Sequence, residues 1–236
     1  MSGAARVPSP AGLPEGVVIG GHRYLRAPVS VRFPAEAEMP ESKRHLQLRT
    51  LLFQFLELAF SQVAAIGCDQ FVYWDPTDPR ACLAPDAFVR FGEPNDLFSL
   101  WKVWERGAPQ VAVEIISDSD AGEPAWDEKL EKYRRLGVSE LVRFDAESAD
   151  RPLRVWDLVE GDLLERQLAE SRAESRYLRG FWLAVEQPDT GLALRLSHDE
   201  PGARLFPTSA EHEAEGRRAA EQRVRELEAE LSRRLP

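Results

Sequence analysis

The chain has 236 residues, of which 43% are hydrophobic and 30% charged, and its formal net charge is -10. This length is enough to bury a sizeable core in one domain with appendages, or in two domains at most. The acidic balance argues against sequence-independent coating of nucleic acid or of anionic membrane, because those functions use broad basic faces. A local basic groove that meets phosphate through a metal ion stays compatible with this charge.

The apolar runs and the cysteines indicate the compartment. The first 16 residues contain no apolar core of a signal peptide, and no later run approaches the roughly 20 apolar residues of a membrane span. Cys68 and Cys82 stand apart and have no CxxC spacing. The histidines are equally dispersed, at His22, His45, His198 and His212. We therefore expect a cytoplasmic protein with no membrane partner, no zinc site and no disulfide framework, in which oxygen ligands hold any metal ion.

Residues 1–40 differ from the rest of the chain in their proline and glycine content. Six prolines fall in this segment, at Pro8, Pro10, Pro14, Pro28, Pro34 and Pro40. Such a composition predicts an extended N-terminal arm, with one short strand over Tyr24–Val31. We expect the folded domain to cover residues 41–207.

A helix is predicted directly after Pro40, over residues 41–63. Its apolar residues recur at three-and-four spacing, which marks the side that faces the core. The residues of this side are Leu48, Leu51, Leu52, Phe55, Leu58 and Ala59.

Short strands joined by turns are predicted on both sides of a central passage. Before it, Asp-Pro pairs mark turns between short strands over 71–91, and 99–109 is predicted as a loop with one helical turn. After it, 152–168 is predicted as a hairpin whose turn is Glu160-Gly161-Asp162.

The central passage, from Gln110 to Phe144, reads as strand, helix, strand. A helix is predicted within the segment 123–138, and Gly137, a residue common at the C-terminal ends of helices, terminates it. A crossover of this kind makes the two flanking strands parallel neighbours. Together with the hairpins, it predicts an α/β (α+β) fold with a mixed sheet flanked by helices.

The last segment, residues 208–236, is predicted to form a charged C-terminal helix. From Ala210 onward it contains seven Glu and six Arg. Val224, Leu227 and Leu231 form an apolar seam of under two heptads, which is too short for a secure coiled coil by itself. Two interpretations have equal weight: a helix that binds a second copy or a partner, and a solvated tail.

Glu114 interrupts a nearly unbroken apolar run, in the stretch QVAVEIISDSD that begins at Gln110. An unpaired charge buried in such a strand costs several kcal/mol, so a cation, a hydrogen-bond network or a proton must compensate it. The small Ala112 on the same face leaves room beside the carboxylate.

Two other residues are candidates to act with Glu114. Asp86 follows a proline at the start of an alternating strand, and Lys129 lies early in the next helix, four residues before Tyr133. Two carboxylates and a lysine can hold a hard divalent cation and activate water for attack on a phosphate. The same residues also suit a structural ion pair, and spacing alone leaves both interpretations open.

Three segments resemble, in order and spacing, the Uma-two family of predicted restriction endonucleases in the PD-(D/E)XK nuclease superfamily. They are PDAFVRF from Pro85, PQVAVEIISDSD from Pro109 and WDEKLEKYRRLGVSELVRFD from Trp126. The resemblance runs from about residue 41 to 185 and is strongest over 85–145. It implies a restriction endonuclease-like fold and Mg²⁺-dependent hydrolysis of DNA by a metal-activated water, with Mn²⁺ as a substitute.

Carried over residue by residue, the resemblance implies metal ligation by Asp86, Glu114 and the backbone carbonyl of Ile115, with Lys129 as the catalytic lysine. Restriction-like enzymes often dimerise to cut both strands, so a homodimer is one expectation and a nicking monomer is the other.

The chain departs from the usual strand pattern at one position. Ile116 occupies the slot two residues after the glutamate, where the superfamily pattern has a lysine. Lys129 on the following helix would replace that lysine, and Lys132 is its rival.

The remaining candidates have weaker support. Ser117, Asp118 and Asp120 follow the central strand and could bind water, but they also suit helix capping. Glu41 and His45, one turn apart on the first helix, suit an exposed helix surface, and Trp101 and Trp104 suit core packing. The scattered cations Arg90, Lys102 and Arg106 suit ordinary surface charge.

Two other functions remain open from the sequence. One is a nuclease-fold scaffold that acts through protein–protein contacts of its C-terminal helix. The other is a sugar hydrolase in which a protonated Glu114 is the general acid, and this one needs no metal ion.

Overall fold

The computed structural model describes residues 17–19, 22–24, 42–116, 123–168, 170–188 and 190–234. The chain divides into two compact units, residues 1–40 and 41–236. The first contains an antiparallel hairpin of β1 (Val17–Ile19) and β2 (His22–Tyr24). The strand predicted over Tyr24–Val31 lies, after its first residue, outside the described residues. The predicted boundary between residues 207 and 208 stays a prediction.

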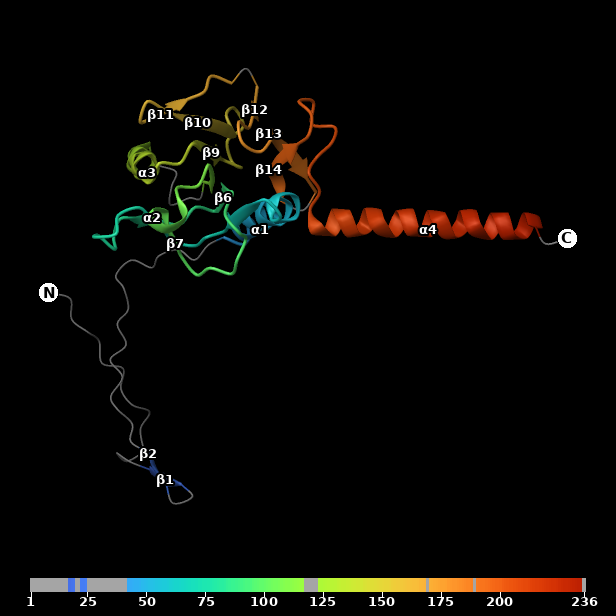
Figure 1. Cartoon of the computed structure of the whole chain (residues 1–236), viewed down its shortest axis with the longest axis horizontal. Helices are drawn as coiled ribbons and strands as arrows, with labels where there is room; N and C mark the ends of the chain where they lie inside the picture. Colours follow the sequence, from blue (N-terminus) through green and yellow to red (C-terminus); the bar gives the residue numbers. More distant parts are fainter. Residues whose placement is uncertain are drawn as a thin grey trace. The chain divides into compact units, whose positions relative to one another are not determined.

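The second unit contains four helices and twelve strands within its described residues (Figure 1). The helices are α1 (Lys43–Phe60), α2 (Val103–Arg106), α3 (Glu123–Leu136) and α4 (Ser209–Arg234). The strands are β3 (Ala64–Gly67), β4 (Val72–Tyr73), β5 (Cys82–Leu83), β6 (Ala87–Phe91), β7 (Trp101–Lys102), β8 (Val111–Ile115), β9 (Glu140–Phe144), β10 (Leu153–Val159), β11 (Asp162–Glu165), β12 (Arg172–Glu174), β13 (Phe181–Gln187) and β14 (Gly191–Ser197). Across these ranges, no helix is long and apolar enough to cross a lipid bilayer.

The central sheet has six strands in the order β11-β10-β9-β8-β6-β3. Strands β8 and β9 are parallel and are joined by α3, whereas the other neighbouring pairs are antiparallel. The predicted parallel pair is therefore confirmed, and so is the mixed α+β fold class. The parallel pair brings the ends of β8 and β9 to the same edge of the sheet.

Two three-stranded sheets accompany the central sheet, in the orders β5-β4-β7 and β12-β13-β14. The sequence analysis did not predict the second of these, or strand β3. In β14 the arginine between Leu194 and Leu196 is buried like its neighbours, although the alternation of the sequence would place it on a solvent-facing side.

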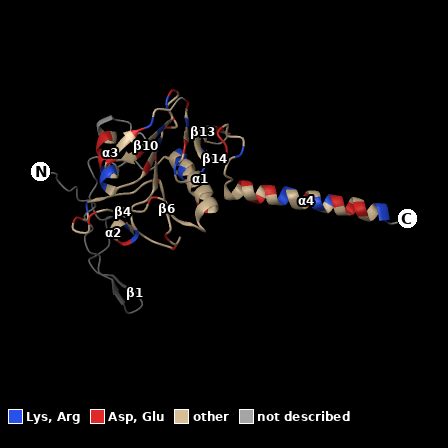
Figure 2. Cartoon of the chain, turned by 45° about the horizontal axis from the view of Figure 1, so that its top comes forward, with Lys and Arg blue, Asp and Glu red and all other residues tan. Residues whose placement is uncertain are grey.

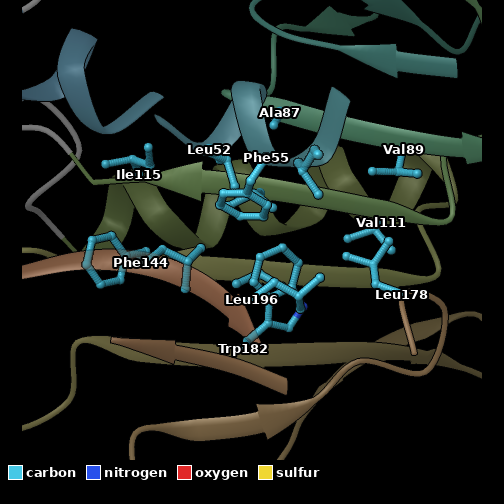
Figure 3. Packing of buried hydrophobic residues seen from close by; sticks show 14 of the residues in the cluster. Leu52, Phe55, Ala87, Val89, Val111, Ile115, Phe144, Leu178, Trp182 and Leu196 are labelled. Carbon is cyan, nitrogen blue, oxygen red and sulfur yellow. The ribbon is translucent and has the colours of Figure 1, made fainter. Parts of the chain in front are cut away.

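One face of the central sheet packs against α1 and strands β13 and β14. Strand residues with odd numbers in β8, such as Val111 and Ile115, meet Phe55 of α1 and Trp182 of β13 on this face (Figure 3). Side chains alternate between the two faces of a strand, so the other residues of β8 must face the opposite side.

The opposite face packs against α3 and the small sheet that contains β7. Here Ala112 of β8 and Leu141 of β9 lie in one buried cluster with Tyr133 of α3 and Trp101 of β7. Glu114, two residues after Ala112, belongs to this face. Burial on both sides gives the central strands the rigidity that a positioned side chain needs.

Helix α1 corrects one predicted core position. Leu58 is exposed, whereas Leu56, which the sequence analysis did not place on the inner side, is fully buried. The inner stripe runs through Leu48, Leu52, Phe55 and Leu56, and Leu58 falls outside its width at 100° per residue. At the other end of the stripe, the Ser42 side chain accepts a hydrogen bond from the His45 amide and caps the helix.

The predicted hairpin of β10 and β11 is present, with a shorter turn than expected. Val159 pairs with Asp162, so only Glu160 and Gly161 form the loop. Both have positive φ, 51° and 90°, as a two-residue type I′ turn requires. Asp162 is therefore the first residue of a strand rather than a turn residue.

Candidate metal and catalytic centre

Asp86 and Glu114 face each other across the antiparallel strands β6 and β8. Ala87 pairs with Val113, so the residue before Ala87 lies opposite the residue after Val113. Opposed residues of this kind have their side chains on the same face of the sheet. The two acids are 6% and 2% exposed respectively, so two carboxylates share one nearly dry site.

Glu114 receives two side chains from α3. Lys129 Nζ lies 2.9 Å from Glu114 Oε2, and the Tyr133 hydroxyl donates a hydrogen bond to Glu114 Oε1. Lys129 and Tyr133 are four residues apart and therefore project from the same side of the helix. The predicted spacing of these two residues thus places both of them on the buried carboxylate.

The protonation of Glu114 reflects its burial. The pKa of this carboxyl is raised from its ordinary 4.5 to about 7, mainly because burial removes water and also because of the negative charge of Asp86. The ammonium of Lys129 and the hydrogen bond from Tyr133 lower the pKa and only partly offset burial. The site therefore favours a further positive charge beside Glu114.

Asp86 is held by one backbone and one side-chain contact. Its Oδ2 accepts a hydrogen bond of 2.8 Å from the Ile115 amide, and its Oδ1 lies 2.8 Å from His45 Nε2. His45 comes from the first turn of α1, so the helix and two strands meet at this carboxylate. The sequence analysis gave His45 little weight, since one histidine on a helix surface is weak evidence for a site.

Lys132, the rival of Lys129, lies on another side of α3. Its Nζ pairs with Glu128 at 2.8 Å, and both side chains are exposed. Lys129 is only 25% exposed and reaches toward the sheet. In the structure, Lys129 is the lysine beside Glu114.

Arg143 is a second cation near the acids, and the sequence analysis overlooked it. It is the register partner of Glu114 in the parallel pair of β8 and β9, so both side chains leave the sheet on the α3 face. Its guanidinium lies 5.0 Å from the ring centre of Trp126 in α3 and 3.6 Å from Asp145. The alternation of ELVRFD, which puts Leu141 and Arg143 on one face, was the available signal.

The donor set at this edge suits a hard divalent cation. Asp86 and Glu114 can supply carboxylate oxygens, and Ile115, the last residue of β8, whose amide contacts Asp86, could supply a backbone carbonyl. Mg²⁺ commonly takes one or two carboxylates and keeps several waters, so two acids provide enough protein ligands for it. Within the described residues, no group of three or more His, Cys, Asp and Glu side chains could hold a metal ion.

A pocket adjoins Asp86 on the α1 side. It lies between the first turn of α1 and the end of β8, and its lining includes Ser42, His45, Leu48, Ile115 and Glu147. His45 and Ile115 are the two residues that contact Asp86. The pocket is therefore separated from Asp86 by these two residues, and neither acid lines it.

The scattered cations that the sequence analysis considered are used elsewhere. Arg90 donates hydrogen bonds to the carbonyls of Arg106 and Ala108, which fixes the loop before β8. Lys102 pairs with Glu105 on the surface. These contacts assign Arg90 and Lys102 to local structure.

The two tryptophans differ in their surroundings. Trp101 is fully buried and donates its indole N–H to the Gly107 carbonyl, as expected for a core residue. Trp104 is 45% exposed, so the expectation that it packs in the core is wrong. It lies in the short helix α2, whose residues include none that is buried. The remaining weak candidates, Glu41, Ser117, Asp118 and Asp120, lie outside the described residues.

Comparison with known proteins places this geometry in context. A family model described as "Uma2: Putative restriction endonuclease" matches residues 35–186, which is more than half of the chain. A crystal structure from Anabaena variabilis ATCC 29413, described as "a putative nuclease belonging to DUF820", is similar with a TM-score of 0.43 and 12% sequence identity. That match covers 68% of this chain and 80% of the other. No functionally curated protein matches the chain.

Proposed function

Since the chain belongs to the Uma2 restriction endonuclease family, we propose that it is a Mg²⁺-dependent endonuclease that hydrolyses phosphodiester bonds of DNA. The observation that carries the proposal is the buried pair of Asp86 and Glu114 with Lys129 at 2.9 Å from the second acid. A lone structural ion pair would leave Asp86 unexplained, because that carboxylate lies on the same face and raises the pKa of Glu114. A divalent cation between the acids would remove this repulsion.

In the proposed site, Asp86, Glu114 and the Ile115 carbonyl hold the cation. When bound, Mg²⁺ would polarise a phosphoryl oxygen and acidify the attacking water. The rigid, two-sided burial of β8 keeps the donors in place, which lowers the reorganisation needed when substrate arrives.

Lys129 supplies the positive charge that the reaction needs on the protein side. Its ammonium lies next to the proposed metal-binding acids, and its side chain is a quarter exposed, which would let a substrate phosphate approach it. Attack of water on phosphorus forms one P–O bond and breaks another, and negative charge grows on the phosphoryl oxygens in between. A positioned ammonium stabilises that charge more than the ground state.

Tyr133 and His45 act as positioning residues in this proposal. Tyr133 fixes Glu114 through Oε1 and leaves Oε2 to Lys129, while His45 fixes Asp86 through Oδ1. Partners of this type orient metal ligands and are worth one to two orders of magnitude in affinity or activity, about 10- to 100-fold.

The test is cleavage of supercoiled plasmid with Mg²⁺ or Mn²⁺, with EDTA as the blank. Asp86→Asn, Glu114→Gln and Lys129→Met should each lower the rate about a hundredfold or more. Lys132→Met is the matched control and should cleave like wild type, because its surface pair with Glu128 is remote from the acids.

Calorimetric titration with Mg²⁺ separates the roles of these residues. The two acid variants should lose metal binding, whereas Lys129→Met should keep it and lose only cleavage. Cleavage that persists in EDTA would contradict the metal-dependent mechanism. Wild-type protein that neither cleaves DNA nor binds Mg²⁺ would leave a scaffold function instead, and metal-free hydrolysis of sugar polymers would indicate the glycosidase.

A further inference from the structure

Helix α4 contains 26 residues, and none of them is buried. Three large apolar side chains, Val224, Leu227 and Leu231, are 53%, 42% and 59% exposed. A helix that is polar on nearly every side gains little from internal hydrogen bonds alone, because most helical stability comes from packing one apolar face. A surface that covers the exposed apolar seam of α4 would therefore stabilise this helix.

The seam has the spacing of a coiled coil. Ala220, Val224, Leu227 and Leu231 follow one another at intervals of four, three and four residues, as d, a, d and a positions of a heptad. A β-branched residue at a and leucine at d favour two strands over higher oligomers. The seam has a defined length, since Arg217 and Arg234 occupy the next a and d positions on either side.

The charges beside the seam are complementary to those of a second, identical helix. Arg223 precedes Val224 at a g position, and Glu228 follows Leu227 at an e position. In a parallel pair of identical helices, Arg223 of one protomer faces Glu228 of its partner, and symmetry repeats this attraction on the other side. Figure 2 shows that positively and negatively charged residues are interspersed along α4.

The antiparallel arrangement is less favoured by the same charges. It would place Glu221 of one protomer against Glu228 of the other, twice, and these like charges offset the two attractive contacts that it gives Arg223 with Glu230. The parallel arrangement has its two attractive contacts without this opposing repulsion. Within one helix, Arg223 contacts only Glu226, at 3.3 Å between exposed side chains, and such a surface pair competes weakly.

We propose that α4 pairs with α4 of a second copy of this chain in a parallel, two-stranded coiled coil. The occupant of the exposed seam is thus the same seam of another molecule. The inference does not depend on nuclease activity, because it rests only on the exposure, spacing and charges of α4.

The first turn of α4 is fixed to the folded domain, so this pairing would join two domains and not two loose tails. Thr208 and Glu211 form reciprocal hydrogen bonds between side chain and backbone, which caps the helix. Glu211 also pairs at 2.9 Å with Arg195, a fully buried residue of β14 that donates to the Phe206 carbonyl.

The first experiment is sedimentation equilibrium of the full-length protein over a range of concentrations. The mass should rise from 26.6 kDa toward twice that value as concentration increases. Leu227→Lys should raise the dissociation constant tenfold or more, about the effect of 1.4 kcal/mol. Ala229→Lys, on the side of α4 away from the seam, is the matched control and should leave the dissociation constant unchanged. A monomer at every concentration, or a dimer that Leu227→Lys leaves intact, would overturn the proposal.

The second experiment tests the flanking charges and the orientation. Arg223→Glu alone should weaken the dimer, and adding Glu228→Arg in the same chain should restore it, whereas Arg225→Glu outside the seam should have no effect. In a background with Cys68→Ser and Cys82→Ser, Val224→Cys should form an interchain disulfide on oxidation, because parallel pairing sets residue 224 against residue 224. A dimer that does not form this disulfide would overturn the parallel arrangement, because an antiparallel pair sets residue 224 against residue 227.

Discussion

Lys129 Nζ of helix α3 lies 2.9 Å from Glu114 Oε2 of strand β8. The strand position two residues after the glutamate holds Ile116, which packs among the apolar residues on the same face. The cation beside Glu114 therefore comes from helix α3 and not from position 116.

Replacement of Tyr133 by phenylalanine should weaken the hold on Glu114. The variant keeps the buried ring but removes the hydroxyl that donates to Glu114 Oε1. A buried carboxylate that loses one donor costs about 1–3 kcal/mol, so the free energy of unfolding of the metal-free protein at pH 8 should fall by that amount. Urea unfolding with EDTA present measures it, with Tyr73→Phe on the small sheet as the control. Equal loss in both variants would contradict the specific role of Tyr133.

Glu114 should make the stability of the metal-free protein depend on pH. Burial raises its pKa to about 7 in the folded state, above its ordinary 4.5, so the folded protein holds a proton that the unfolded chain releases between these values. The free energy of unfolding should therefore fall as pH rises from about 4.5 to about 7, by at most about 3 kcal/mol at 1.36 kcal/mol per unit of pKa difference.

The Glu114→Gln variant isolates this contribution, because an amide does not titrate. The free energy of unfolding of the variant should depend less on pH than that of wild type. From pH 5 to pH 8, the variant should therefore become more stable relative to wild type. Urea unfolding in EDTA at the two pH values measures it. Parallel pH profiles for variant and wild type would show that Glu114 does not hold the proton.

Removal of the His45 side chain should weaken the cation site. His45→Ala leaves Asp86 Oδ1 without its contact to α1, so the carboxylate is less restrained and the Mg²⁺ dissociation constant should rise about 10- to 100-fold. Calorimetry measures the constant. His45→Gln, which keeps a polar group on the side chain, should recover part of the loss, and His212→Ala on the exposed helix α4 should cause none. Wild-type affinity in His45→Ala would contradict the positioning role.

Glu140 at the start of β9 should be one of the most costly residues to remove. It is fully buried and accepts hydrogen bonds from the Ser175 hydroxyl, the Trp182 indole and Arg166, which ties the central sheet to the segment around β12 and β13. Glu140→Ala leaves these buried donors without an acceptor and should lower the free energy of unfolding by about 3–5 kcal/mol. The exposed Glu186→Ala should cost little. Urea unfolding decides, and a loss below about 1 kcal/mol would show that the network relaxes.

Local pattern predicted the elements that carry the centre. A nearly unbroken apolar run located β8, the turn signal of Gly137 ended α3, and the crossover between β8 and β9 made them parallel, as observed. The structure also brings Asp86, Glu114 and Lys129 together, although their roles in catalysis stay predictions. These features follow from short-range periodicity, which a sequence displays directly.

What the sequence determined by itself was therefore the face on which most residues of the central helices and strands lie. What only the tertiary structure decided was which faces meet: His45 against Asp86, 41 residues away along the chain, Arg143 beside Glu114, and Glu140 within a ring of donors from β13 and its neighbourhood. The buried Arg195 of β14 likewise has its partner, Glu211, on another element. The physical reason is that side-chain periodicity is a local property, whereas the compensation of a buried charge depends on the packing of distant segments.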